Sequence, residues 1–283
     1  MSEAASGASP YRDSSAREFL GLIPTHNPFR WVMPVDQSLC TWAGNLFGGA
    51  GLGAAIEAME ATSDRPVVWA TAQYLSFAKV DSVLDLDVTL AVHGRATTQA
   101  RVVVSCGREE ILTVNGALGS RETKGEGSFA VMPTVAPPLE CPVRRHRFGT
   151  QNSINEAMAA RMAIGREMEE LDGTPSVDGR SAMWARLPGM ASSSAAGLAI
   201  LGDFVPMAIG QALGVRAGGS SLDNTLRVIQ LVPTEWVLLD IRVHGVHHGF
   251  GHGLVHLWAE DGTLMATASQ STIVRYWDDQ AGP

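Results

Sequence analysis

The sequence predicts an α+β fold made of two tandem copies of one unit, in which an antiparallel sheet wraps a central helix. Three observations support this prediction: an alternating pattern typical of half-buried strands, a helix rich in small residues ahead of it, and the return of the same order of elements about 153 residues later. The chain has 283 residues, of which 45% are hydrophobic and 18% charged. Such a chain can bury one large core or two of ordinary domain size.

The alternating pattern is clearest in residues 83–93, where leucine and valine alternate with aspartate and threonine. A period of two predicts a strand with one buried face and one face in water. Similar segments rich in Val, Leu and Thr are bounded by Gly, Asp or Lys turns, and they predict further strands at residues 67–77, 97–106 and 109–118.

The small-residue helix is expected at residues 48–61, which begin with four glycines in six positions. Each glycine in a helix interior costs about 1 kcal/mol relative to alanine. Several of them on one helix make sense where a neighbouring backbone must approach closely. We therefore expect this helix to lie tightly inside a curled sheet.

The second half repeats this order. A short strand is expected at residues 181–187, a small-residue helix at 195–213, and strands at 221–232, 235–244, 251–259 and 263–275. Residues 152–170 fit either a helix or an opening strand. One helix laid along an antiparallel sheet in each half is the hotdog architecture. Two unrelated α+β domains are the alternative.

The expected domain organisation follows from shifts in composition. Residues 1–22 form a flexible tail, residues 23–119 the first hotdog repeat and residues 151–283 the second. Residues 120–150 are rich in Gly, Glu, Lys and Pro and show little periodicity, so they are expected to be a linker.

Charge and cysteine content exclude several classes of protein. The net charge of -8 and pI near 5.5 argue against nucleic-acid binding, which requires clustered Lys and Arg. The one basic cluster, residues 144–147, fits a surface loop, with a contact to a phosphate of coenzyme A as the lesser alternative. Three cysteines without CxxC spacing predict reduced thiols and a cytoplasmic location. We expect no signal peptide and no apolar stretch of about 20 residues able to span a membrane.

Several motifs resemble type II acyl-CoA thioesterases over most of residues 29–275. In the first half, Leu46-Phe47-Gly48-Gly49 opens the helix, and Gln73-Tyr74-Leu75 and Gly94-Arg95 follow. In the second half the matching motifs occur together and in order. They are Ser221-Leu222-Asp223-Asn224, Pro233-Thr234-Glu235-Trp236-Val237-Leu238, Asp261-Gly262-Thr263-Leu264 and Ala268-Ser269-Gln270.

The resemblance implies a double hotdog that hydrolyses a fatty acyl-CoA to free acid and CoA. In that family an Asp, a Ser or Thr and a Gln hold the attacking water, and these roles fall here on Asp203, Ser221 and Gln270. Two departures bear on the acyl pocket: Asn224 replaces a residue that is often His, and residues 226–230 lack the usual aromatic and His-rich stretch.

Thioester hydrolysis needs a positioned water, a base and donors for the developing oxyanion. We expect Asp203 to align and deprotonate the water, with direct attack by its carboxylate as the lesser possibility. Its place near a helix start is expected to lower its pKa. Backbone N–H groups of Gly48 and Gly49 are the expected oxyanion donors, and with Arg95 they complete the predicted substrate-binding residues.

Each of these residues also has a structural explanation. Asp203 fits an N-cap, and Ser221 beside a Gly-rich run fits a turn. Gln270 is more informative, because an amide in an otherwise apolar last strand needs partners if it is buried. The repeat spacing places Gly49 opposite Asp203 and Ala117 opposite Gln270, so we expect one functional site per chain.

Competing motifs are weaker. Residues 49–54 match a GxGxxA dinucleotide pattern, but no apolar strand precedes them. Five histidines are clustered between residues 244 and 256. They lack the spacing of zinc hydrolases and fit a hairpin, so neither a metal nor a cofactor is expected. These histidines are His244, His247, His248, His252 and His256.

The absence of GxSxG argues against a serine hydrolase of the α/β type. A non-catalytic acyl-binding hotdog protein and a hotdog hydratase or dehydratase remain alternatives. A homo-oligomer is expected, because exposed sheet edges commonly pack again.

Overall fold

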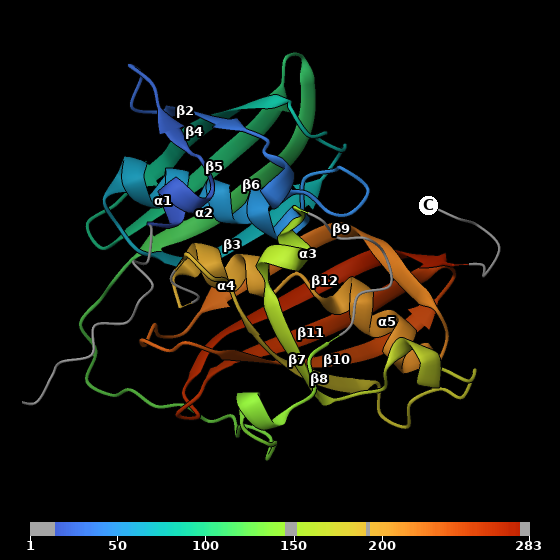
Figure 1. Ribbon diagram of the computed structural model, residues 1–283. Helices are drawn as coiled ribbons and strands as arrows, with labels where there is room; N and C mark the ends of the chain where they lie inside the picture. The colour runs from blue at the N-terminus through green and yellow to red at the C-terminus, as the bar shows by residue number, and fades with distance from the viewer. Residues whose placement is uncertain (1–14, 145–151, 191–192, 278–283) are drawn as a thin grey trace, which may run out of the picture.

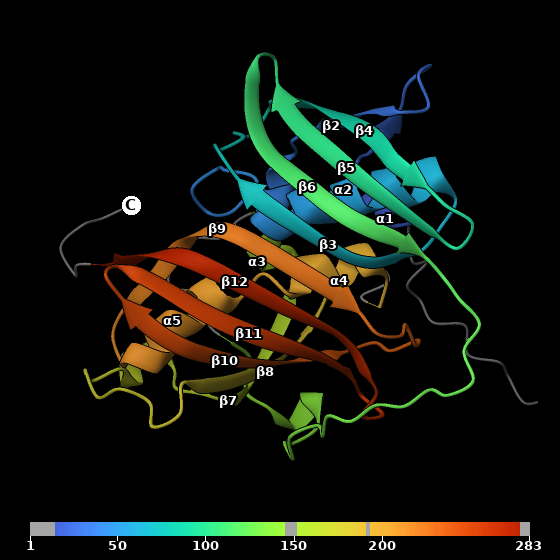
Figure 2. The ribbon, with the colours of Figure 1, turned by 180° about the vertical axis from the view of Figure 1, so that it is seen from behind.

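The computed structural model describes residues 15–144, 152–190 and 193–277. In these ranges the chain forms one antiparallel sheet of twelve strands, with helices packed on one face (Figure 1) and strands in front when the molecule is seen from behind (Figure 2). The strand order is β1-β2-β4-β5-β6-β3-β9-β12-β11-β10-β8-β7. Each half of the sequence thus fills one half of the sheet, and β3 and β9 join them.

The elements of the first half lie close to the predicted ranges. Its strands are β1 (Ile23–Pro24), β2 (Arg30–Pro34), β3 (Val67–Tyr74), β4 (Val83–His93), β5 (Thr97–Cys106) and β6 (Glu109–Gly119). Its helices are α1 (Ala16–Phe19) and α2 (Gly48–Ser63). The strands β4 and β5 match the alternating segments residue for residue.

The second half follows the same order after a different start. Its strands are β7 (Ala159–Ile164), β8 (Arg180–Arg186), β9 (Ala217–Val228), β10 (Val237–His247), β11 (Phe250–Ala259) and β12 (Leu264–Tyr276). Its helices are α3 (Ile154–Ala157), α4 (Ala195–Leu201) and α5 (Val205–Leu213). Residues 152–170 therefore hold both a short helix and a strand. The helix predicted at 195–213 is two helices, separated at residues 202–204.

The two halves of the chain are related by an internal two-fold symmetry across the antiparallel pair of β3 and β9. Thr71 and Thr225, 154 residues apart, are hydrogen bonded across this strand pair at 2.6 Å. Each of the two strands also carries a bulge, at Val68 and at Leu222, where the register with its other neighbour shifts. A bulge is a specific local feature, so its recurrence at the same spacing supports a duplicated unit.

One hydrophobic core runs through both halves, between the helices and the inner face of the sheet. A second cluster covers the outer face of β8, β10 and β11, where Trp184 and Trp258 pack with Cys141 and Met132. Trp184 Nε1 donates a hydrogen bond to the Ala136 carbonyl at 2.9 Å. The later part of the expected linker therefore packs against the second half, while the domain boundaries themselves stay predictions.

Glycines let α2 and α4 pack closely. A Cβ on Gly49 would lie 2.8 Å from the Ala199 carbonyl oxygen, and one on Gly53 would lie 3.1 Å from that of Ala196. The backbone that approaches the glycines is thus that of α4, and not that of the sheet as the sequence suggested. This contact brings the start of α2 against the end of α4.

One segment, Ala195–Leu213, is long and apolar enough to cross a membrane by length and composition alone. It differs from the expectation that no such stretch exists. However, 72% of its apolar window is buried inside the fold, and the chain breaks it into α4 and α5. Its hydrophobicity is therefore used in the protein core.

Replacing Gly53 by leucine should lower the free energy of unfolding by about 1–3 kcal/mol, because the new side chain meets the α4 backbone. Gly125→Leu is the control, since a Cβ there meets nothing within 4 Å. Urea denaturation of both variants measures the effect. Equal stability of the Gly53 and Gly125 variants would contradict the proposed close packing.

Candidate active site

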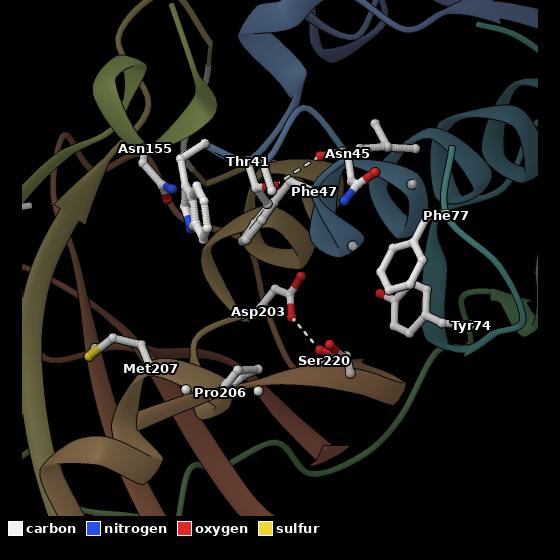
Figure 3. Close-up of a pocket in the computed structure, with 18 of the residues that line it drawn as sticks. Thr41, Asn45, Phe47, Tyr74, Phe77, Asn155, Asp203, Pro206, Met207 and Ser220 are labelled. Carbon is white, nitrogen blue, oxygen red and sulfur yellow. Dashed lines mark hydrogen bonds between the residues drawn. The ribbon is translucent and has the colours of Figure 1, made fainter. Parts of the chain in front are cut away.

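Asp203 lies in the break between α4 and α5, where its side chain reaches the contact between the two halves (Figure 3). The residue is only 6% exposed. The Gly49 N–H donates to Asp203 Oδ2 at 2.6 Å. Ser221 Oγ donates to Asp203 Oδ1 at 3.4 Å, and Gln270 Nε2 donates to the same oxygen. The structure thus brings Asp203, Ser221 and Gln270 together around one carboxylate.

Gln270 is held in a single orientation. It lies on β12 opposite Asn224 and is 3% exposed. The backbone N–H of Val205 donates to Gln270 Oε1 at 3.1 Å. Because the oxygen is occupied by a donor, the amide nitrogen must point the other way, toward Asp203 and toward Ser221 Oγ at 3.1 Å.

The bulge at Leu222 places Ser221 on the same face as Gln270. Side chains alternate between the faces of a regular strand, so residues three apart, such as 221 and 224, would lie on opposite faces. The extra residue restores the match: Gln270 pairs with Asn224, whereas Thr272 pairs with Ser221. Ser221 therefore lies in a strand and contacts both Asp203 and Gln270. The alternative interpretation, in which it is a turn residue, does not fit.

Burial raises the pKa of Asp203 to about 7, against the lowering by hydrogen bonds from Gln270, Gly49 and Ser221. The sequence-based expectation of a lowered pKa is therefore wrong, because desolvation outweighs the donors. The N-cap interpretation also fails, since Ser194 caps α4 and Phe204 holds the cap position of α5. Asp203 instead accepts a hydrogen bond from the first turn of α2, in the other half.

A cavity of about 430 Å³ opens onto this carboxylate. Both halves contribute to its walls, which include Asp203 and Ser221 together with Gly48 and Tyr74. Most of the remaining lining is apolar and aromatic, including Trp42, Phe47, Phe77 and Phe204. Figure 3 shows Asp203 between Phe47, Tyr74 and Phe77 of the first half and Pro206 and Met207 of the second.

The structure places the three expected substrate-binding residues in different surroundings. Gly49 donates its N–H to Asp203, so this N–H is occupied. Gly48 lines the cavity, and a Cβ there would lie 2.8 Å from Asp203 Oδ2. Arg95 is exposed in the turn after β4, where its carbonyl accepts from Arg65 at 3.3 Å. Arg65 follows the far end of α2, about 24 Å from Gly48 along a 16-residue helix, so the structure does not bring Arg95 to the site.

Arg144, Tyr74 and Asn224 lie in segments named in the sequence, but none of them was expected among the site residues, and the preferred interpretation placed Arg144 in a surface loop. Arg144 lines the cavity with its guanidinium 5.8 Å from the centre of the Phe204 ring, whereas residues 145–147 lie outside the described residues. Tyr74 and Asn224, both quoted for the resemblance, hold buried polar atoms that have no partner in hydrogen-bond geometry within the part of the chain that the structure describes. Burial raises the pKa of Tyr74 well above its usual value, so its phenol stays protonated.

The equivalent positions in the first half lack this chemistry. By the spacing of 154 residues that relates Thr71 to Thr225, Val67 corresponds to Ser221 and Gly116 to Gln270. A Cβ on Gly116 would meet the Met59 side chain at 3.1 Å. The place of the carboxamide is therefore taken by a methionine. The expected equivalent of Gln270 was Ala117, one residue away.

The five histidines lie along β10 and β11 and the turn between them. His252 Nδ1 lies 3.1 Å from Ser271 Oγ, and His256 packs beside Trp258. Over the described residues, no three His, Cys, Asp or Glu side chains are grouped to hold a metal ion.

Comparisons with known proteins match both halves. Residues 36–119 match the acyl-CoA thioesterase N-terminal domain, and residues 138–274 match the acyl-CoA thioesterase C-terminal domain. A search of curated proteins found no match.

Solved structures agree over nearly the whole chain. A protein of Novosphingobium aromaticivorans DSM 12444, described as a candidate thioesterase, is 33% identical over 89% of this chain and 97% of its own, with a TM-score of 0.79. A hot dog fold protein of Alicyclobacillus acidocaldarius is 19% identical over 93% and 98%, with a TM-score of 0.80. An acyl-CoA thioesterase II of Mycobacterium marinum is 19% identical over 93% and 99%, with a TM-score of 0.71.

The last two likenesses show the fold, and the matched domains show the family. The chain belongs to the acyl-CoA thioesterase family, as a thioester hydrolase with two fused hotdog domains.

Proposed function

We propose that this protein hydrolyses a fatty acyl-CoA to the free acid and CoA, using a water molecule held by Asp203, Ser221 and Gln270. One observation carries the proposal: a buried carboxylate with a pKa of about 7 faces an apolar cavity between the repeats. A base with a pKa near the working pH combines adequate ionisation with adequate basicity.

The carboxylate acts as the base. Asp203 takes a proton from the water molecule while the water oxygen bonds to the thioester carbon. The product is a tetrahedral intermediate whose former carbonyl oxygen is negative. The carbon–sulfur bond then breaks, and the proton passes from Asp203 to the departing thiolate. Ser221 and Gln270 hold the water and the carboxylate in place. Direct attack by Asp203 is less favoured, since both of its oxygens already accept hydrogen bonds.

Gly48 is the better oxyanion donor of the two glycines. Its N–H has no hydrogen-bond acceptor among the described residues, and the residue lines the cavity. It begins α2, where unpaired N–H groups and the positive end of the helix dipole favour negative charge. Gly49, in contrast, positions the base.

The apolar walls of the cavity favour a substrate with an apolar acyl group. Leu46, Phe77 and Leu112 of the first half form part of the lining, and burying an acyl chain against such walls is favourable by about 0.8 kcal/mol per methylene group. A hydratase or dehydratase needs a histidine paired with an acid, and no histidine occurs among the described residues lining this cavity. The cytoplasmic location and the homo-oligomer stay predictions.

Asp203→Asn should reduce kcat by about 10³-fold, because the amide cannot accept the water proton. Release of free thiol from acyl-CoAs of 2 to 18 carbons measures the effect. Asp261→Asn is the matched control, as this carboxylate lies in the exposed turn before β12. Retained turnover in the Asp203 variant would remove the proposed base, and no turnover by the wild type would favour a non-catalytic acyl-binding protein.

The wild-type pH profile should report the ionisation of Asp203. Only the carboxylate form accepts a proton, so log kcat/KM should rise by about 1 per pH unit below the pKa and level off above it. Because that pKa is about 7, the bend should fall near neutrality. Stopped assays from pH 5 to 9 test this; a profile that is flat or falls over this range would rule out Asp203 as the base.

A further inference from the structure

The charged residues of the cavity are unusual for this chain. Among the described residues that line it, Asp203 is the one with an acidic side chain, and Arg144 and Arg275 are the two with cationic side chains. The whole chain carries a net charge of -8. A region with excess positive charge inside an acidic protein attracts anions.

The guanidinium of Arg144 is not in ion-pair distance of any carboxylate within the described residues, and Glu167 acts on it only from farther away. Its backbone N–H bonds the Ala160 carbonyl, and its guanidinium lies over the Phe204 ring at 5.8 Å. No hydrogen bond or ion pair through the guanidinium is present there. Glu167 is close enough to raise the pKa of Arg144 slightly, yet burial dominates and lowers it to about 10.

A partly buried cation without an anionic partner loses hydration that no ion pair replaces, which is unfavourable. Two other partly buried arginines of the second half show a common solution: Arg180 pairs with Asp240 at 2.9 Å, and Arg166 pairs with Asp172 at 3.4 Å. A third, Arg161, donates to the Cys141 carbonyl at 2.8 Å. Arg144 lacks such a carboxylate although it faces a cavity that holds the base. A ligand that carries a negative charge would supply the partner that Arg144 lacks in the protein itself.

Resting on the proposed function, we infer that Arg144, with Arg275 at the cavity wall, binds an anionic oxygen group of the thioester substrate. The guanidinium offers a planar fork of donors that matches phosphate and carboxylate. Two parts of a thioester can supply such a group. One is the phosphate beyond the pantetheine arm, and the other is a carboxylate at the far end of a dicarboxylic acyl chain.

Arg144→Met tests the inference, because methionine keeps an unbranched side chain and removes the charge. Binding is measured by calorimetry in the Asp203→Asn background with four probes: CoA, pantetheine, valeryl-CoA and glutaryl-CoA. Loss of a charge-assisted hydrogen bond should raise Kd by about 10- to 100-fold for the probes that carry the recognised anion. Arg108→Met, in the exposed turn after β5, is the matched control.

The pattern of losses identifies the anion. Weaker binding of CoA and both acyl-CoAs, with pantetheine unchanged, assigns the phosphate, whereas weaker binding of glutaryl-CoA alone assigns the acyl carboxylate. Unchanged binding of all probes by the folded variant overturns the inference. If the methionine variant does not fold, Arg144→Lys decides, since it should weaken the same probes by a smaller factor and unchanged affinity overturns the inference.

This design separates the inference from the proposed function. The binding measurements need no turnover, so they remain decisive even if the wild type hydrolyses no thioester. Conversely, hydrolysis by the wild type with unaltered binding in the Arg144 variants would leave the proposed function standing and remove the anion site.

Discussion

The buried carboxylate of Asp203 is the constraint on which the site depends. It is taken out of water at the contact between the repeats and receives the Gly49 N–H from one repeat and the side chains of Ser221 and Gln270 from the other. Several local features serve this arrangement. The glycines of α2 allow α4 to approach, the break after α4 directs the carboxylate toward α2 and the cavity, and the bulge at Leu222 turns Ser221 inward.

Burial of this group opposes stability at neutral pH. An acid whose pKa is raised from 3.8 to about 7 holds an extra proton in the folded state between these values, so stability falls as pH rises through that window. The protein accommodates this through its large shared core. The same desolvation gives the carboxylate the basicity that proton abstraction from water requires. The first half has Gly49 at the position equivalent to Asp203, so it carries no such buried acid there.

Much of the fold follows from local pattern. The period of two in β4 and β5 identifies them as strands because each pleated face meets either core or water, and the turns at Gly94-Arg95 and Gly107-Arg108 set their ends. The break at residues 202–204 was missed, although Pro206 near the start of α5 is a helix-start signal. The candidate site residues came from the family resemblance. The raised pKa of Asp203 depends on its burial against Gly49, 154 residues away, the bulge at Leu222 on the pairing of β9 with β12, and the position of Arg95 on the turn after β4, which contacts Arg65.

The ionisation of Asp203 itself is the most direct test. With aspartate labelled at the carboxyl carbon, ¹³C NMR titration of the wild type and the Asp203→Asn variant follows every aspartate. We expect one resonance that titrates near pH 7 in the wild type and is missing from the variant. If every aspartate of the folded wild type titrates below about pH 5, as exposed carboxyls do, the claim that burial tunes this group is contradicted.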